Sequence, residues 1–499
     1  MEEQQKTGFL GKVDNFFGVR KAGSTIRTEI VAGLVTFLAM AYILTVNPNQ
    51  ILYAGTYDPL WTSLFMATAF GAIIGTLLMA FLAKLPLAQA SGMGLNAMVG
   101  TIIGGGVGAY STYVFEFSLA NAMFMVLISG IIFFLLSTIS IKGKSLRQYI
   151  FDGIPTSLKV AIPTGIGLFI AFIGFQNSGI IVGNQWTLVD FVNFTNYDIS
   201  VNSAVVCFVG LFLIAILSHL KVKGAVIIGI LGATLLGIPM GITNLDVITG
   251  NQPGITWEFW DSFAKFFSFG DESVLGVAFK GGWNMPAGSI FTIIMIIISM
   301  SMIDMFDTMG TCLGCCAEAG LLDENGVPVR YDKIMYSDSI ATCAGAMLGT
   351  STVTTFVESG AGVAAGGKTG LTALTTACLF LLSTLIIPVF AVIPSAAAAS
   401  ALVYVGVLMM KNVTKVNFES VRVAVPAFLT IIIMPLGYSI TKGIGVGILS
   451  FVIISLLTYP IDYIMYKKGK AEKPTWRISV FTAIVAALFA VYFFVPVAI

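Results

Sequence analysis

Charged residues are scarce in this chain of 499 residues, which excludes most classes of soluble protein. Lys, Arg, Asp and Glu together make up 10% of the sequence, whereas a soluble domain carries about 25%. The formal net charge is +1 and no long run of Lys or Arg is present, so nucleic acid is not expected as a partner. The hydrophobic share of 57% instead predicts an integral membrane protein that is solvated by the lipid bilayer.

Histidine is also scarce, and the cysteines do not occur at the spacings of a disulfide framework or a metal site. The sequence has one histidine, His219, and six cysteines in apolar segments, where we expect small packing residues and no disulfides. The CLGCC run at 312–316 has no nearby histidine or further cysteine to complete a ligand set, so neither a metal nor another cofactor is predicted. With a single histidine, any proton held inside the membrane would have to be carried by carboxyl groups.

Long apolar runs dominate what is present. A first group of seven covers 28–47, 60–82, 89–105, 118–138, 157–177, 201–219 and 224–242. A second group of seven covers 288–315, 336–350, 351–367, 371–391, 395–411, 421–439 and 443–465. Because about 20 apolar residues cross a bilayer as a helix, the predicted fold class is an all-α integral membrane protein with about 14 transmembrane segments.

The two groups divide the chain into five parts. We expect a cytoplasmic N-terminal segment at 1–27, a first repeat at 28–242, an extracellular connector at 243–287, a second repeat at 288–465, and a basic segment with an apolar tail at 466–499. The first part lacks the apolar core of a secretory signal. The tail, about 478–498, is left open as an extra span or an interfacial helix.

The distribution of basic residues predicts the orientation in the membrane. With the N-terminus inside, the inner face receives the basic segments Lys84, Lys142–Arg147, Lys221–Lys223, Arg330–Lys333, Lys368, Lys411–Arg422 and Lys467–Arg477. This agrees with the positive-inside rule. A multi-pass protein of the cell (inner) membrane with a cytoplasmic N-terminus is therefore predicted.

The two groups of spans resemble each other in sequence. SGMGLNA at 91–97 matches SGAGVAA at 359–365, IPT from Ile154 matches IPS from Ile393, and Lys223-Gly224 matches Lys442-Gly443. The matches occur in the same order in both halves. Because a repeat with an odd number of spans must be inserted upside down relative to its partner, the pattern predicts two 7-span inverted repeats.

The paired SGxG motifs interrupt spans three and ten and predict broken helices there. Irregular backbone at membrane depth is tolerated where it lines a cavity, so the motif residues are expected to line a binding site: Ser91, Gly92, Ser359 and Gly360. Polar residues near the same depth complete the candidate site: Asn96, Asp304, Asp307 and Glu358. Carboxyl groups inside a membrane are usually functional, although a structural polar network that joins helices is the alternative.

The segment GVAAGGKT at 362–369 matches the phosphate-binding pattern GxxxxGK[ST]. That motif requires a strand before it and a helix after it in a soluble α/β domain. No such pattern surrounds the segment, so we interpret its glycines as sites of close helix packing.

At these residues the chain resembles the AzgA-like purine permeases of the nucleobase/ascorbate transporter superfamily, which includes uracil and xanthine permeases. The resemblance covers about 15–465. The resemblance rests on four segments: AGLVTFLAMAYILTVNP, SGMGLNA, MIDMFDTMGT and TFVESGAGVAAGGKTGLTAL. One departure is Ser91, where many relatives are expected to have proline.

The resemblance implies a core of spans one to four and eight to eleven, a gate of the remaining spans, and short strands in spans three and ten that meet at the substrate. It implies import of adenine, guanine or hypoxanthine, usually with a proton. Carried over to this sequence, Asn96, Asp304 and Glu358 would bind the base, and Asp307 would support them. Proton coupling would involve Glu358, Asp304 and Asp307.

Two other functions compete with a purine symporter. An anion carrier of the same fold would place basic residues at the half-helix ends, whereas this site is acidic. An intramembrane enzyme that used Asp304 and Asp307 would need further carboxylates at metal spacing. The sequence leaves open the preferred purine, H⁺ or Na⁺ as the coupled ion, and a homodimer.

Overall fold

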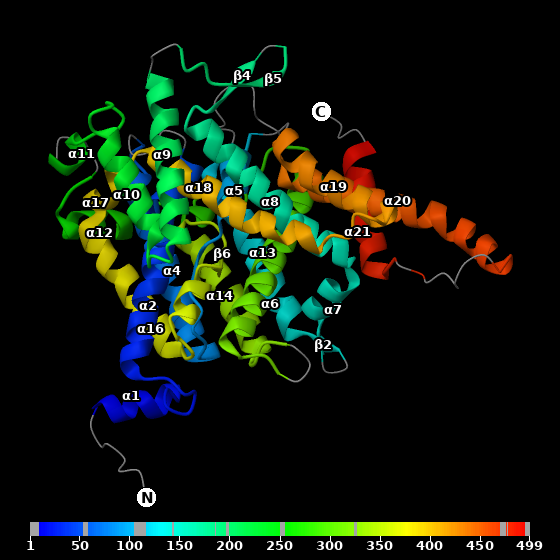
Figure 1. Ribbon diagram of the computed structural model, residues 1–499, viewed down its shortest axis with the longest axis horizontal. Helices are drawn as coiled ribbons and strands as arrows, with labels where there is room; N and C mark the ends of the chain where they lie inside the picture. The colour runs from blue at the N-terminus through cyan, green and yellow to red at the C-terminus, as the bar shows by residue number, and fades with distance from the viewer. Residues whose placement is uncertain are drawn as a thin grey trace, which may run out of the picture.

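The computed structural model describes residues 9–52, 58–103, 116–141, 144–184, 186–195, 199–249, 255–323, 327–469, 476 and 478–494. Within these residues, nine helices are long and apolar enough to cross a membrane, and further apolar helices are shorter. Figure 1 shows them packed side by side, with helix α1 (Phe9–Phe17) across the lower end near the N-terminus. The predicted fold class, an all-α membrane protein, is confirmed.

In the described residues of the first half, the structure has eight helices of the bundle and several short elements. The bundle helices are α2 (Ile26–Met40), α3 (Ile43–Ile51), α4 (Trp61–Leu78, continued by a π-helical turn at Met79–Ala83), α5 (Met93–Ile102), α6 (Leu119–Thr138), α8 (Thr156–Asn177), α9 (Ile199–His219) and α10 (Ala225–Gly237). The short elements are α7 (Leu146–Gly153) and the hairpins β2 (Ser140–Ile141) with β3 (Lys144–Ser145) and β4 (Ile181–Asn184) with β5 (Leu188–Phe191).

The second half follows after the short connector helices α11 (Asp246–Thr249) and α12 (Phe259–Phe267). Its helices are α13 (Ile290–Ala319), α14 (Tyr331–Leu348), α15 (Ser359–Ala364), α16 (Gly370–Ser383), α17 (Ile387–Ala391), α18 (Ser395–Met410), α19 (Val421–Leu436) and α20 (Ile440–Lys467). Helix α21 (Val480–Phe494) lies in the apolar tail and packs on α20, α13 and α7.

Two short strands, one from each half, pair with each other inside the bundle. β1 (Gln89–Ser91) pairs antiparallel with β6 (Val353–Thr355) in the register Gln89 with Thr355 and Ser91 with Val353. All six residues are buried. Each strand leads into a short helix, α5 or α15, as predicted for spans three and ten. Position 92, directly after β1, requires glycine because a Cβ there would lie 2.5 Å from Thr354 Cγ2.

The first span, Ile26–Ile51, has an irregular turn between its two helices, which the sequence did not predict. Helices α2 and α3 are separated at Ala41 and Tyr42, and both residues are buried. Pro48 lies inside α3, where it cannot donate the backbone hydrogen bond of a regular helix. The Tyr42 hydroxyl at this turn reaches Glu358 in the second half of the protein.

Helix contacts form two sets. In one set, α2 and α4 contact α16, α4 and α6 contact α14, and α6 contacts α13. In the other set, α8 contacts α18 and α19, α9 contacts α10 and α18, and α19 contacts α20. Contacts of α8 with α5 and α13, and of α18 with α3, join the two sets.

Candidate functional site

The candidate site begins where β1 passes into α5. The Ser91 hydroxyl donates to Asn96 Oδ1 at 2.7 Å, and the Ser351 hydroxyl donates to the same oxygen. Asn96 Nδ2 donates to the Ser91 carbonyl at 3.3 Å. The Ser91 hydroxyl also lies 3.1 Å from Thr350 Oγ1. Serine, in place of the proline expected in many relatives, therefore fixes the orientation of the buried Asn96 amide.

The start of α15 lies on the other side of the strand pair. Ser359 Oγ accepts the backbone N–H of Ala88 at 3.0 Å, so Ser359 joins the two broken spans. Gly360 follows it and is partly exposed. Glu358 precedes α15, and its Oε1 accepts the Tyr42 hydroxyl at 2.5 Å. Sequence reasoning missed Tyr42, since a tyrosine in an apolar span carries no signal of its own.

Helix α13 supplies the two aspartates of the candidate site. Asp304 is fully buried; its Oδ2 accepts the Thr342 hydroxyl at 3.2 Å, whereas Oδ1 has no hydrogen-bond partner among the residues that the structure describes. Asp307 lies one turn farther along α13 and is partly buried. Its carboxyl group interacts electrostatically with those of Glu358 and Asp338. The structure therefore brings Asp307 close to Glu358, and it leaves one oxygen of Asp304 available for a ligand.

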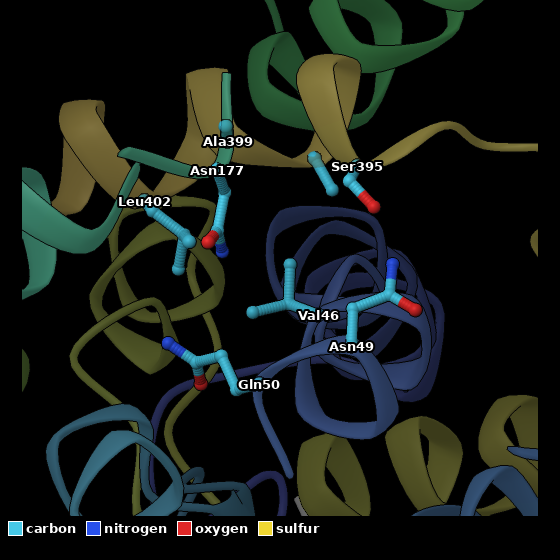
Figure 2. A pocket seen from close by; sticks show the side chains of 8 residues that line it. Val46, Asn49, Gln50, Asn177, Ser395, Ala399 and Leu402 are labelled. Atoms are coloured by element: carbon cyan, nitrogen blue, oxygen red, sulfur yellow. The ribbon is translucent and has the colours of Figure 1, made fainter. Parts of the chain in front are cut away.

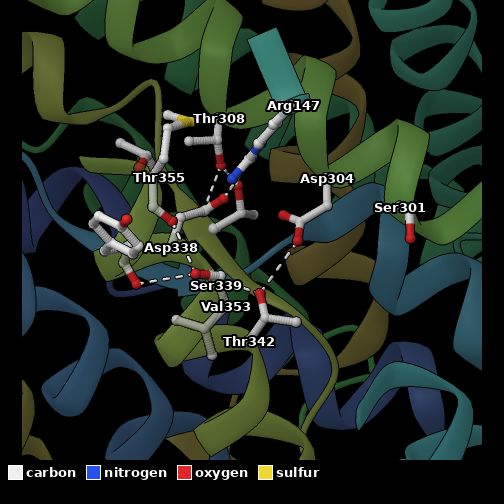
Figure 3. Close-up of polar contacts among 12 residues, drawn as sticks. Arg147, Ser301, Asp304, Thr308, Asp338, Ser339, Thr342, Val353 and Thr355 are labelled. Atoms are coloured by element: carbon white, nitrogen blue, oxygen red, sulfur yellow. Dashed lines mark hydrogen bonds and ion pairs between the residues drawn. The ribbon is translucent and has the colours of Figure 1, made fainter. Parts of the chain in front are cut away.

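A buried ion pair lies beside Asp304. Arg147 Nη2 is 2.8 Å from Asp338 Oδ2, and the two side chains are 1% and 0% exposed. The Thr308 hydroxyl donates to Asp338 Oδ1 at 2.6 Å and lies 2.7 Å from Thr354 Oγ1 in β6. Figure 3 shows Arg147 and Asp304 on the same side of this cluster. The ion pair is thus connected to the strand crossing by side-chain hydrogen bonds.

Arg147 is buried, unlike a basic residue exposed at the end of a span. It belongs to the segment Lys142–Arg147, which the basic residues predict on the inner face, and its guanidinium carbon lies 4.1 Å from the centroid of the Phe133 ring. It belongs to α7, the helix between α6 and α8. Asp338 was missed as well, although the rule that selected Asp304 applies to it, because it is an acid inside an apolar span.

The phosphate-binding pattern has a structural role. Backbone N–H groups of Lys368 and Thr369 donate to the two carboxylate oxygens of Glu29 at 3.0 and 3.1 Å, and Glu29 is fully buried. A Cβ on Gly362 would overlap Thr36 Oγ1 of α2. The glycines therefore permit close packing on α2, as the sequence interpretation predicts, and Glu29 occupies the amides that a phosphate would need.

The chain is similar to known membrane permeases along most of its length. A family model described as a permease family matches residues 27–446. The chain is 36% identical to the adenine permease AdeP of Escherichia coli over 458 residues, 91% of this chain and 92% of that protein. It is 36% identical to the guanine/hypoxanthine permease PbuG of Bacillus subtilis over 467 residues, 92% of this chain and 95% of that protein.

A solved structure shares the fold. The transmembrane domain of a cyanobacterial bicarbonate transporter, BicA, superimposes with a TM-score of 0.56 over 84% of this chain and 97% of that chain. The sequence identity is 14%, so this likeness concerns the fold alone.

Proposed function

Because this chain belongs to the permease family, a family of membrane transporters rather than enzymes, we propose that it carries purine nucleobases across the cell membrane by proton symport. The observation that supports the substrate class most directly is similarity along most of the chain to permeases named for adenine, guanine and hypoxanthine. The proposed substrate-binding residues are Ser91, Gly92, Asn96, Asp304, Glu358, Ser359 and Gly360.

The chemistry of the buried side chains suits a flat, neutral base. A purine presents ring N–H donors and bare ring nitrogens. Within the described part of the chain, Asp304 Oδ1 has no hydrogen-bond partner, so it is able to accept from a ring N–H. The carbonyl oxygen of Asn96 already accepts two hydroxyls, and one N–H of its amide donates to the Ser91 carbonyl, so the second N–H is the donor that remains for an acceptor of the base.

Glu358 is the proposed main proton carrier. Burial disfavours the charged form of a carboxyl group, and Glu358 is 9% exposed with the Tyr42 hydroxyl as its hydrogen-bond donor. The Asp307 carboxyl group interacts electrostatically with Glu358, so it influences that proton. A protonated, loaded site carries less charge than an empty ionised one, so it crosses the membrane interior at lower cost.

Motion of a core against a gate would expose the site alternately to the two sides. The helix contacts agree with such a division, since the helices of the predicted core contact one another and the helices of the predicted gate contact one another. We place the N-terminus in the cytoplasm on the basis of the basic segments, and the connector between halves on the outer face.

Uptake into proteoliposomes tests this function. We expect accumulation of radiolabelled adenine, guanine or hypoxanthine that increases with an inward proton gradient and disappears when a protonophore is added. Bicarbonate and sulfate, offered in parallel, serve as anion controls. Anion uptake without purine uptake in folded protein would contradict the proposal and favour the anion carrier.

The anion carrier is the weaker candidate despite the shared fold. Its ligand would need a free positive charge in the site. The charge of Arg147, the buried cation beside Asp304, is balanced by Asp338 at 2.8 Å, although its Nε and Nη1 have no hydrogen-bond partner among the described residues. The predicted binding residues are acidic or neutral.

A further inference from the structure

The pocket between α3, α8 and α18 does not provide room for a purine. Gln50 and Asn177 are among the side chains that line it in Figure 2. Its enclosed space holds about one water molecule. A more extensive surface lies at the opposite end of the bundle, where helix α1 crosses below α2 in Figure 1.

Helix α1 is attached to the bundle by aromatic and apolar contacts. The Phe16 and Phe17 rings lie 6.0 and 5.9 Å from the ring of Phe81, in the π-helical turn that continues α4. Lys84 Nζ donates to the Phe16 carbonyl at 3.1 Å and lies 4.2 Å from the centroid of the Phe16 ring. Phe17 also packs in an apolar cluster with Leu371 of α16. These contacts fix α1 across the end of the bundle and leave Phe16 49% exposed.

The exposed charges on α1 and the segment after it are mostly positive. Lys12, Arg20, Lys21 and Arg27 are exposed. Asp14 is the one acidic residue between Lys12 and Arg27 in the sequence. Arg20 Nε lies 3.0 Å from Asp14 Oδ2, so this acid balances one of the four positive charges. The other three are in excess and face outward.

Arg27 marks the boundary between this basic surface and the apolar surface of α2. Ile30, Val31 and Leu34 on α2 are 48%, 38% and 42% exposed. They follow Arg27 by three, four and seven residues, so all four side chains share one helix face. Exposed apolar side chains on a membrane span face the lipid tails. Arg27, in the first turn of the same face, therefore lies at the depth of the lipid headgroups.

We propose that α1 and the segment up to Arg27 form a binding surface for anionic phospholipid headgroups. Lys12, Lys21 and Arg27 contact the lipid phosphates, and Phe16 lies at the boundary between headgroups and tails. Basic and apolar side chains of an interfacial helix act together in this way at an anionic membrane surface. Because α1 packs on α4 and α16, the bound lipid is held by the predicted core. The inference does not depend on which substrate is carried.

Quenching of a fluorophore on α1 by spin-labelled lipid tests this surface. In the full-length chain with its six cysteines replaced, Asn15→Cys carries a bimane label on the exposed face of α1, and Ser268→Cys provides an exposed control site in the connector. Nanodiscs contain equal mole fractions of nitroxide-labelled phosphatidylglycerol or phosphatidylcholine. We expect phosphatidylglycerol to quench the label at position 15 about twofold more strongly, because the basic residues attract it. The two lipids should quench the label at position 268 equally.

A charge variant identifies the residues that recognise the lipid. The triple variant Lys12→Gln, Lys21→Gln and Arg27→Gln removes the three excess charges and keeps the ion pair of Arg20 with Asp14. It should abolish the preference for phosphatidylglycerol at position 15. High salt should weaken the same preference in the parent, because ions screen charges at a surface. The salt experiment leaves the surface unaltered, so its result is independent of the folding of the variant.

The matched control removes three exposed basic residues from the second half of the chain, through Lys411→Gln, Lys415→Gln and Lys468→Gln. This variant should keep the parental preference at position 15. Equal quenching by the two lipids at position 15 of the parent would overturn the inference. A parental preference in the triple variant of the α1 surface, or a preference that high salt leaves unchanged, would overturn it as well.

Discussion

Replacement of Arg147 with methionine is expected to destabilise the folded protein strongly. The substitution leaves Asp338 fully buried without its cation, and loss of one partner of a buried ion pair costs about 3–5 kcal/mol. Thr308 still donates one hydrogen bond to Asp338, which offsets part of this cost. The fraction of monodisperse protein that survives heating in detergent measures the effect.

Two variants make this prediction specific. The double variant Arg147→Met with Asp338→Asn removes both charges and should recover most of the lost stability, because no buried charge remains unpaired. Arg422→Met breaks an ion pair with Asp462 whose side chains are 38% and 23% exposed, so it should cost only about 0–1 kcal/mol. Equal losses of stability for Arg147→Met and Arg422→Met would contradict the prediction, because the buried ion pair would then contribute no more than the exposed one.

Glu358→Gln is expected to abolish accumulation of purine driven by a proton gradient. Glutamine keeps the shape of a protonated glutamate and can still accept the Tyr42 hydroxyl, but it cannot release a proton. Exchange of purine for purine without a gradient should therefore persist, since no net proton movement is required. Proteoliposomes loaded with unlabelled hypoxanthine, with and without an imposed pH gradient, distinguish the two activities.

The matched control for this experiment is Glu419→Gln. Glu419 is exposed in the loop before α19, so its loss should leave accumulation unchanged. Gradient-driven accumulation by Glu358→Gln at the rate of the parent would remove Glu358 as the proton carrier. Asp307 and Asp304 would then be the remaining candidates.

The sequence predicted the parts of the structure that repeat in the two halves. The SGxG motifs identified the interruptions in spans three and ten, because glycine and serine disfavour continuous helix and occurred at matching positions in both halves. The structure confirms strands there, and β1 pairs with β6. The packing role of the glycines in 362–369 was also predictable, since no strand–loop–helix context for phosphate binding was present.

The sequence could not predict contacts between segments that have no common pattern. Arg147 follows a span end, where a basic residue normally faces water, and only the fold shows that α7 directs it inward to Asp338 on α14. Tyr42 reaches Glu358 across 316 positions of the sequence. The role of Glu29 was not predictable, because an acidic residue is common in the first turn of a helix. Each of these partners is set by tertiary packing rather than by local composition.

Equilibrium binding to the purified protein tests the central claim most directly. The measurement compares saturable binding of tritiated hypoxanthine, guanine and adenine to the parent and to Asp304→Ala, which removes the buried oxygen that has no partner among the described residues. We expect at least one base to bind the parent, and we expect Asp304→Ala to lower its affinity about tenfold or more, because a buried group of the base would lose its hydrogen-bond partner. Parental affinity in Asp304→Ala, or no binding of any of the three bases to folded parent protein, would contradict the account.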